Sequence, residues 1–195
     1  AYNFGALKLF PAPDLVFLEP LDGPNLLFLL RTNGELYKLA DELFRARGYR
    51  LVLRPHENKM EIQNSKDARL ILFPYSTASD TLQRFIFHLA AIETNHNAVI
   101  VLEEPESHAF PYYTKILAES MALDEGGNQF FITTHNPYFL FPLVCKAPRD
   151  QLAVFITTME DYETRVRPLN EQEIAQAMDL NADLFYNFDR FTGGA

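Results

Sequence analysis

The chain has 195 residues, of which 48% are hydrophobic and 22% are charged, a composition that suits one globular domain or one lobe of a larger protein. The net charge of −9 and the lack of a Lys/Arg-rich run argue against a nucleic-acid track on the chain itself. The single cysteine excludes an intrachain disulfide and fits a reducing compartment, so we expect a cytoplasmic protein. No apolar run reaches the roughly 18 residues that a membrane span needs, so no membrane contact is expected.

The first part of the chain predicts a small arm of mixed structure. A short strand is expected at 14–18, and apolar residues at helical spacing predict a helix over 34–47 that ends at Gly48. Alternating residues then predict antiparallel strands near 50–54, 59–63 and 69–73. The densest basic stretch, "FRARGYRLVLR", is interpreted as a solvated face rather than a phosphate-binding track.

The second part alternates helix and strand, which predicts a mostly parallel sheet flanked by helices. "AVIVL" (98–102) has the continuous apolar pattern of a parallel strand buried on both faces. Asp80 and Gln83 have the spacing of a capping box at the start of the helix before it. In chain order, the expected elements are a helix at 79–94, a strand at 98–102, a helix at 112–123, a strand at 129–134, a helix near 138–144, strands near 152–158 and 164–169, and a helix from 170.

Polar side chains follow two neighbouring strands of the expected sheet. Glu103 and Glu104 come directly after "AVIVL", and His135 comes directly after "QFFITT". Ligands of open parallel sheets bind outside the carboxyl ends of the strands, so these groups are expected to face one site. One carboxylate there can hold magnesium through water, and the other can deprotonate an attacking water. A histidine beside them can donate a hydrogen bond to developing negative charge, so the set predicts phosphoryl transfer.

Two stretches resemble motifs of ABC-type ATPases. "VIVLEEPESH" resembles the Walker B motif, which implies that Glu103 reaches Mg²⁺, although most relatives have aspartate there, and that Glu104 is the catalytic glutamate. "FFITTHNP" resembles the region of the switch histidine, which implies that role for His135. The resemblance therefore implies a P-loop NTPase core of the α/β class that binds ATP and Mg²⁺.

The same resemblance assigns two further segments. Residues 107–108 fall at the D-loop, and "TASDTLQR" (77–84) is placed like the ABC signature, which binds the nucleotide of a second subunit in a homodimer. Ala78, Ser79 and Asp80 stand where the usual signature has a serine and two glycines, so Ser76 or Ser79 would supply the hydroxyl. The residues implied for nucleotide contact in trans are Ser76, Thr77, Ser79, Gln83 and Arg84, and those of the D-loop are Ser107 and His108.

Each motif also has a plainer interpretation. "VLEEP" can be a strand that runs into a polar turn. "TTHNP" can be a helix start capped by Asn136, with His135 a satisfied polar residue. Asp80 would repel a phosphate at the signature unless its side chain turns back toward its own helix. The order signature, helix, Walker B strand, helix, switch strand favours the ATPase interpretation.

The chain lacks a phosphate-cradling loop of the form G-x-x-x-x-G-K-[ST]. None of the eight glycines is followed by lysine or has that spacing. We therefore expect the Walker A loop on a segment outside this chain, in cis or on a separate chain. The expected organisation is an arm with a helix and a hairpin over residues 1–75, followed by the C-terminal part of the ATPase core over residues 76–195.

Two classes of function remain open on the sequence. The first is an ATPase, and the second is a non-hydrolysing scaffold used for dimerisation or partner docking. "EEPESHAFP" and "ITTHNPYFL" are most similar to prokaryotic ATPases related to the overcoming-lysogenization-defect family. That similarity implies DNA-related work or phage defence, with a possible nuclease or DNA partner. The chain's own acidic "EDYE" (160–163) is interpreted as a solvated hairpin turn.

Overall fold

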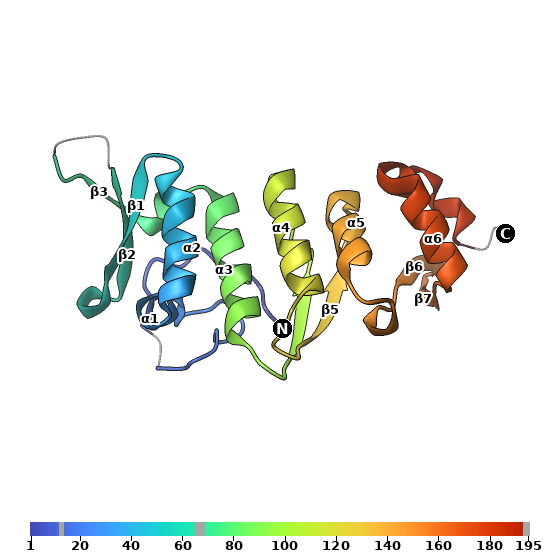
Figure 1. Cartoon of the computed structure of the whole chain (residues 1–195), viewed down its shortest axis with the longest axis horizontal. Coiled ribbons are helices and arrows are strands. Elements are labelled where there is room, and N and C mark those ends of the chain that lie inside the picture. The colour runs from blue at the N-terminus through green and yellow to red at the C-terminus, as the bar shows by residue number, and fades with distance from the viewer. Residues whose placement is uncertain (12–13, 65–68, 193–195) are drawn as a thin grey trace.

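A computed structural model describes residues 1–11, 14–64 and 69–192 (Figure 1). The helices are α1 Leu26–Thr32, α2 Gly34–Arg45, α3 Asp80–Thr94, α4 Pro111–Ala122, α5 Pro137–Lys146 and α6 Glu171–Leu180. The strands are β1 Tyr49–Arg54, β2 Lys59–Asn64, β3 Leu72–Pro74, β4 Val99–Glu103, β5 Gln129–Thr133, β6 Phe155–Glu160 and β7 Glu163–Pro168. Helices α2 to α5 stand side by side in a row, and the strands form three small sheets along it (Figure 1).

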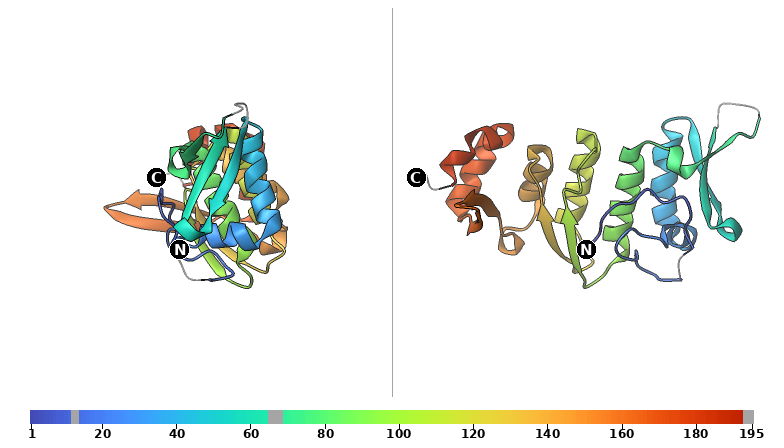
Figure 2. Two further views of the ribbon diagram at one scale, coloured as in Figure 1. Left: turned by 90° about the vertical axis from the view of Figure 1, so that its left-hand side faces the viewer. Right: turned by 180° about the vertical axis from the view of Figure 1, so that it is seen from behind.

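The mostly parallel sheet predicted for the second part is correct only for β4 and β5, which pair in parallel. β1, β2 and β3 form an antiparallel sheet at one end of the molecule, as predicted. β6 and β7 form an antiparallel hairpin that projects from the body (Figure 2, left). Asp161 and Tyr162 connect them, both with positive φ, which is the geometry of a two-residue hairpin turn. The acidic "EDYE" stretch is therefore an exposed turn, as expected.

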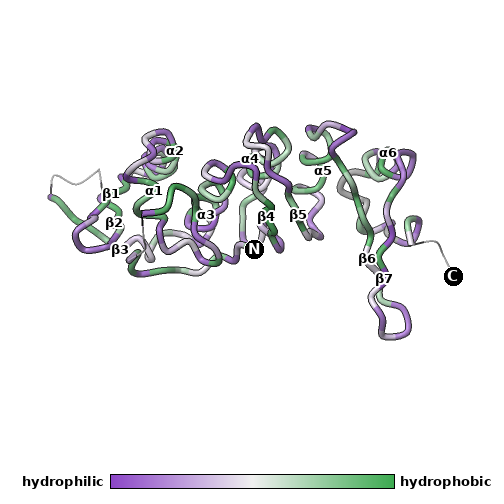
Figure 3. The backbone as a smooth tube through the Cα atoms, turned by 90° about the horizontal axis from the view of Figure 1, so that it is seen from below, coloured by the Kyte–Doolittle hydropathy of each residue, from purple (hydrophilic) through white to green (hydrophobic). Residues whose placement is uncertain are grey.

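One face of the β4–β5 sheet is covered and the other is bare. Ile100 and Leu102 are buried in the main core, whereas Val99, Val101 and Phe131 are 60%, 41% and 53% exposed. No described helix lies over the sheet in the view from behind (Figure 2, right), although β4 is hydrophobic along its length (Figure 3). The prediction that "AVIVL" is buried on both faces is thus wrong for this chain. A continuous apolar run indicates that both faces of a strand are suited to burial. It does not indicate whether the layer that buries them belongs to the same chain.

The expected strand at 14–18 is also absent, because a side chain replaces its neighbouring strand. Asn25 is fully buried, accepts from the Glu19 N–H at 2.8 Å and donates to the Phe17 carbonyl at 2.7 Å. Leu18 is fully buried beside them and donates its own N–H to Thr94 Oγ1 at 2.9 Å. These bonds satisfy the backbone without a sheet. The residues after it form α1, which the sequence analysis missed.

The N-terminal residues pair with the central sheet. Tyr2 forms a parallel bridge with Leu102, and its N–H donates to the Val101 carbonyl at 3.0 Å. The Tyr2 hydroxyl donates to the Leu18 carbonyl at 2.6 Å. Both edges of β4 are therefore occupied. Among the described residues, β5 pairs only with β4, which leaves its outer edge open. The division of the chain at residue 75 stays a prediction, and one core cluster extends across it.

Local pairing explains the start of α3 and the charged end of the basic stretch at residues 44–54. Ser79, not Asp80, caps α3, because its hydroxyl accepts from the Leu82 N–H at 3.4 Å. Arg54 forms ion pairs with Glu57 and Glu61 at 2.6 Å and 2.8 Å. This pairing is typical of a solvated charged face, as the sequence analysis proposed.

The buried His88 of α3 makes the stability of the fold sensitive to acid. Burial, and then the charge of Arg84, lowers the pKa of His88 from 6.5 to about 4, and no described residue bonds its Nδ1. The unfolded chain binds this proton below pH 6.5, while the folded chain resists it down to about pH 4. The contribution of neutral His88 to the free energy of unfolding is therefore complete above pH 6.5 and is lost as the pH falls toward 4.

We expect the free energy of unfolding to fall by about 2 kcal/mol between pH 7 and pH 5 through His88 alone. Urea titrations of the parent and of His88→Gln at both pH values measure it, since the glutamine variant should lack this part of the loss. His96→Asn, at an exposed histidine on the loop after α3, is the control and should keep the parental pH dependence. An unchanged pH dependence in His88→Gln would contradict the assignment.

Candidate functional site

The structure brings Glu104 and His135 together. The register of the sheet pairs Glu103 with Thr133, so the two strands end side by side. Glu104 Oε1 lies 2.8 Å from His135 Nδ1, and the side chains are 41% and 75% exposed. The Glu104 N–H also donates to the Thr133 carbonyl at 2.9 Å, which extends the pairing by one residue. The site is thus a solvent-accessible pair at the carboxyl ends of two parallel strands.

The predicted D-loop residues line the turn that follows Glu104. The Ser107 hydroxyl donates to Glu104 Oε2 at 3.1 Å, and the Ser107 N–H donates to the Glu104 carbonyl at 2.9 Å. The carboxylate of Glu104 is therefore held through both oxygens. Glu104 and His108 have φ values of 41° and 61°, a conformation that costs most residues free energy and persists where the surroundings enforce it.

Glu103 points to the bare face of the sheet, the same face as Val99 and Val101, because strand residues alternate. Within residues 1–11, 14–64 and 69–192, no side chain bonds to its carboxylate, and no group of three or more metal-binding side chains occurs. A magnesium ion that keeps most of its water needs only one or two carboxylates, so this exposed group fits that ion. The two adjacent glutamates face different directions and can have different roles.

Glu106 is a site residue that the sequence analysis missed. It is only 4% exposed, and its Oε1 accepts a short hydrogen bond from the Thr134 hydroxyl, one residue before His135. Thr134 Oγ1 in turn accepts from the Asn136 N–H at 3.0 Å. The third acidic residue in "EEPE" was the available signal, but only the fold shows that it points inward to the other strand end.

The predicted signature residues lie at the start of α3, next to the same turn. Ser76 and Thr77 are in a 3₁₀ segment, where the Thr77 hydroxyl donates to the Pro74 carbonyl at 2.7 Å. Ser79 is exposed, and its capping hydroxyl still has a proton to donate. The Thr81 hydroxyl donates to the His108 carbonyl at 2.7 Å, which ties this helix start to the turn after β4.

Gln83 and Arg84 make contacts within the chain. Gln83 is 3% exposed, and its Nε2 donates to the Ala78 carbonyl at 2.8 Å, so it holds the segment before α3 instead of forming the predicted capping box with Asp80. Arg84 pairs with Asp80 at 2.7 Å and lies over the ring of Phe4, 4.8 Å from its centroid. This ion pair offsets the negative charge of Asp80 beside the proposed phosphate position.

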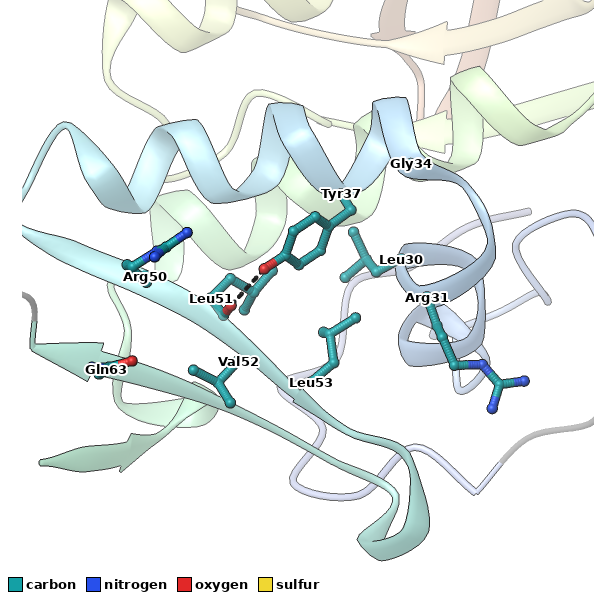
Figure 4. A pocket seen from close by; sticks show the side chains of 9 residues that line it. All are labelled: Leu30, Arg31, Gly34, Tyr37, Arg50, Leu51, Val52, Leu53 and Gln63. Atoms are coloured by element: carbon teal, nitrogen blue, oxygen red, sulfur yellow. Dashed lines mark hydrogen bonds between the residues drawn. The ribbon is translucent and has the colours of Figure 1, made fainter. Parts of the chain in front are cut away.

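A separate groove of about 500 Å³ lies between α2 and β1, at the end of the molecule that carries the three-stranded sheet (Figure 4). Leu30, Tyr37, Arg50 and Gln63 are among its lining residues, and the Tyr37 hydroxyl donates to the Leu51 carbonyl at 2.9 Å. None of the predicted site residues lines it. The groove is therefore distinct from the strand-end site.

A protein-family model described as "AAA domain, putative AbiEii toxin, Type IV TA system" matches residues 25–140, more than half of the chain. The chain belongs to this AAA domain family. The matched range includes α3, β4, β5 and the pair Glu104–His135. The comparison with curated protein sequences found no match to this chain.

Three solved structures show the fold of this AAA domain. An SMC ATPase, reported for ATP-driven dimerisation and DNA-stimulated activation, is 15% identical with a TM-score of 0.51, covering 77% of this chain and 92% of its own. The Smc head of Pyrococcus yayanosii with a coiled coil and joint is 17% identical with a TM-score of 0.51, and the match covers 78% of this chain and 30% of that one. The Smc head of Pyrococcus furiosus with an extended coiled coil, bound to the C-terminal domain of ScpA, is 16% identical with a TM-score of 0.51. The match covers 78% of this chain and 39% of that one. This chain thus spans well under half of the two Pyrococcus structures.

The AAA domain therefore has an α/β fold similar to that of SMC ATPase heads, as the resemblance to ABC-type ATPases implied. No helix among the described residues has the length and apolarity to cross a membrane.

Proposed function

We propose that the chain is part of an ABC-type enzyme that hydrolyses ATP, with Glu104 and His135 as its catalytic residues. The contact of 2.8 Å between these two side chains, at adjoining ends of parallel strands, carries the proposal. Glu104 accepts a proton from the attacking water. Because the carboxylate of Glu104 can only accept, Nδ1 of His135 donates to it, and the ring of His135 is proposed to interact with the phosphate as negative charge develops there.

Glu103 is proposed to hold a magnesium ion through its water shell. The carboxylate of Glu103 is exposed at the same strand end, whereas the carboxylate of Glu104 already contacts His135 and Ser107. When bound, magnesium neutralises charge on the β- and γ-phosphates. Glu103 thus serves binding and Glu104 serves the chemical step, which gives each of the two adjacent carboxylates its own role.

The phosphate-cradling loop is proposed to come from a segment outside this chain, in cis or as a second chain. None of the eight glycines provides that loop. The bare face at Val99, Val101 and Phe131 and the open edge of β5 support the proposal, since a further strand and helix would cover both. The site at Glu104 lies at the end of this same sheet.

The signature serine is proposed to act on the nucleotide of a second copy. Ser79, or else Ser76, would donate to the partner's γ-phosphate from the exposed start of α3. The similar SMC ATPase is described by its ATP-driven dimerisation, which supports the same behaviour here. Bound ATP then joins the two subunits, and its hydrolysis releases them.

We expect the complete protein to become a dimer when ATP and magnesium are added and to return to a monomer after turnover. Sedimentation velocity with ATP, with ADP and without nucleotide measures this directly. Ser79→Ala with Ser76→Ala should weaken the dimer without weakening ATP binding to the monomer. Thr192→Ala, at a hydroxyl far along the chain from α3, is a matched control.

The outcome separates the two classes of function. An enzyme dimerises with ATP and releases phosphate. A non-hydrolysing scaffold dimerises, with or without nucleotide, and releases none. A monomer at saturating ATP, even with hydrolysis blocked, counts against the dimer proposal.

The work that ATP drives is proposed to concern DNA or defence against phage, in the cytoplasm and with a nuclease or DNA partner. The resemblance to ATPases related to the overcoming-lysogenization-defect family supports this. Nuclease activity is proposed for a partner, and the part of the chain that the structure describes has no group of three or more metal-binding side chains. The net charge of −9 supports a proposal in which DNA is contacted by that partner or by a local patch.

A further inference from the structure

Two cross-links join the turn after β4 to the end of β5. The exposed link is the pair of Glu104 and His135, and the buried link is the hydrogen bond from Thr134 to Glu106. After β4 the two links use Glu104 and Glu106, which are two residues apart, and after β5 they use the adjacent residues Thr134 and His135. Any shift of one strand end against the other therefore changes both links together.

The exposed link cannot fix its own geometry. Ion pairs between exposed side chains contribute about 0 to 1 kcal/mol, which is too little to hold a ring that is 75% exposed in one position. The backbone around His135 must be held by other contacts. Thr134 provides them, because its hydroxyl bonds to Glu106 on one side and to the Asn136 N–H on the other.

Asn136 extends this connection into α5. Its side chain accepts from the Tyr138 N–H at 2.9 Å and so caps the helix. The chain of hydrogen bonds runs from Glu106 through Thr134 to Asn136, and His135 lies between the last two. The plainer interpretation of "TTHNP" as a capped helix start is thus correct, and it places His135 rather than excluding a role for it.

Stability does not explain a carboxylate at Glu106. Its Oε2 is buried without a partner among the described residues, and burying an incompletely bonded carboxylate costs folding free energy. Burial raises the pKa of Glu106 from its ordinary value, against the bond from Thr134, which lowers it. An apolar side chain would fill this place at lower cost.

We propose that Glu106 is a positioning residue, whose buried bond to Thr134 sets the place of His135 relative to Glu104 and to the bound phosphate. The inference rests on the proposed ATPase function. Glu106 itself does not touch the reacting atoms. It determines how far the switch histidine reaches.

The test compares Thr134→Val with Thr134→Ser in the complete ATPase. Valine keeps the shape and removes the hydroxyl, so kcat should fall about 10- to 100-fold, the usual effect of misplacing a catalytic group by an ångström or less, while KM for ATP stays within about twofold. Serine keeps the hydroxyl and should restore most of kcat. Glu106→Ala should behave like Thr134→Val, and Glu106→Gln, which keeps an acceptor oxygen, like Thr134→Ser.

The double variant Glu106→Ala/Thr134→Val should be no slower than the slower single variant, because both remove one link. Equal kcat in Thr134→Val and the parent would overturn the proposal, as would fully multiplied effects in the double variant. A loss in melting temperature with unchanged kcat per folded molecule would assign the bond a structural role only.

A second readout needs no hydrolysis and separates this inference from the proposed function. Amide hydrogen exchange of residues 133–136 in this chain without nucleotide should speed up about tenfold in Thr134→Val and stay parental in Thr134→Ser. Unchanged exchange in Thr134→Val would overturn the positioning role whether or not ATP is hydrolysed. A parental protein without turnover, but with the expected exchange, would instead overturn the ATPase proposal alone.

Discussion

Glu104→Gln should slow ATP turnover by about 10²–10⁴-fold in the complete protein and leave ATP binding intact. Glutamine keeps the size of the side chain but cannot take a proton from water. The trapped nucleotide should then hold the dimer together. Steady-state phosphate release and ATP affinity, measured on the same preparation, test the prediction. Glu125→Gln, at an exposed carboxylate in the loop before β5, is the matched control.

Two neighbouring variants show that the effect is specific. Glu103→Ala should weaken magnesium-dependent ATP binding, whereas His135→Ala should slow turnover with little loss of binding. The pair of Glu104 and His135 is exposed, so its removal should cost at most about 1 kcal/mol of stability. Unfolding cannot therefore account for a loss of 10²-fold or more. Parental turnover in Glu104→Gln would reduce "EEP" to a polar turn at the end of a strand.

Patterns of short range predicted most of the helices and strands. The wide apolar face of α3 and the alternation in β1 and β2 follow from the periods of helix and strand, which any local window contains. The closeness of Glu104 and His135 was also predictable, because parallel strands end at one edge of a sheet. The structure brings these two side chains together at that edge, as the sequence analysis expected.

Contacts between distant segments could not be predicted in this way. Asn25 replaces a strand neighbour for residues 15–19 with its own amide, and nothing in the pattern of "DLVFL" indicates that. Glu106 was missed for the same reason, since its acceptor role depends on the hydroxyl of Thr134, 28 residues away. Such side-chain bonds depend on the finished fold and leave no periodic signal.

The bare sheet face is where the sequence pattern and the structure disagree most informatively. "AVIVL" has the composition of a strand covered on both sides, yet Val99 and Val101 face solvent together with Phe131 of β5. The β6–β7 hairpin adds exposed Phe155, Met159 and Val166 on a second sheet surface. Exposed apolar side chains gathered on a sheet face indicate a contact surface. Because β5 also lacks a second partner strand among the described residues, the missing layer is expected to include a strand.

Adding the segment that carries the Walker A loop, in cis or as a second chain, should therefore raise the melting temperature of this chain by about 10 °C or more. Burying a valine or phenylalanine side chain contributes about 1.5–3 kcal/mol, and each kcal/mol raises the melting temperature of a chain of this size by about 2–4 °C. Differential scanning calorimetry of the chain with and without the segment measures the gain.

Phe131→Ser should remove much of this gain while leaving the melting temperature of the isolated chain nearly unchanged, because Phe131 is already exposed there. Leu70→Ser, at an exposed leucine near the three-stranded sheet, is the matched control and should keep the full gain. If the isolated chain unfolds cooperatively at high temperature and gains nothing from the segment, the bare face has another occupant. The Walker A loop would then have to reach Glu104 without pairing with β5. The open edge of β5 would no longer account for how that loop is held beside Glu104.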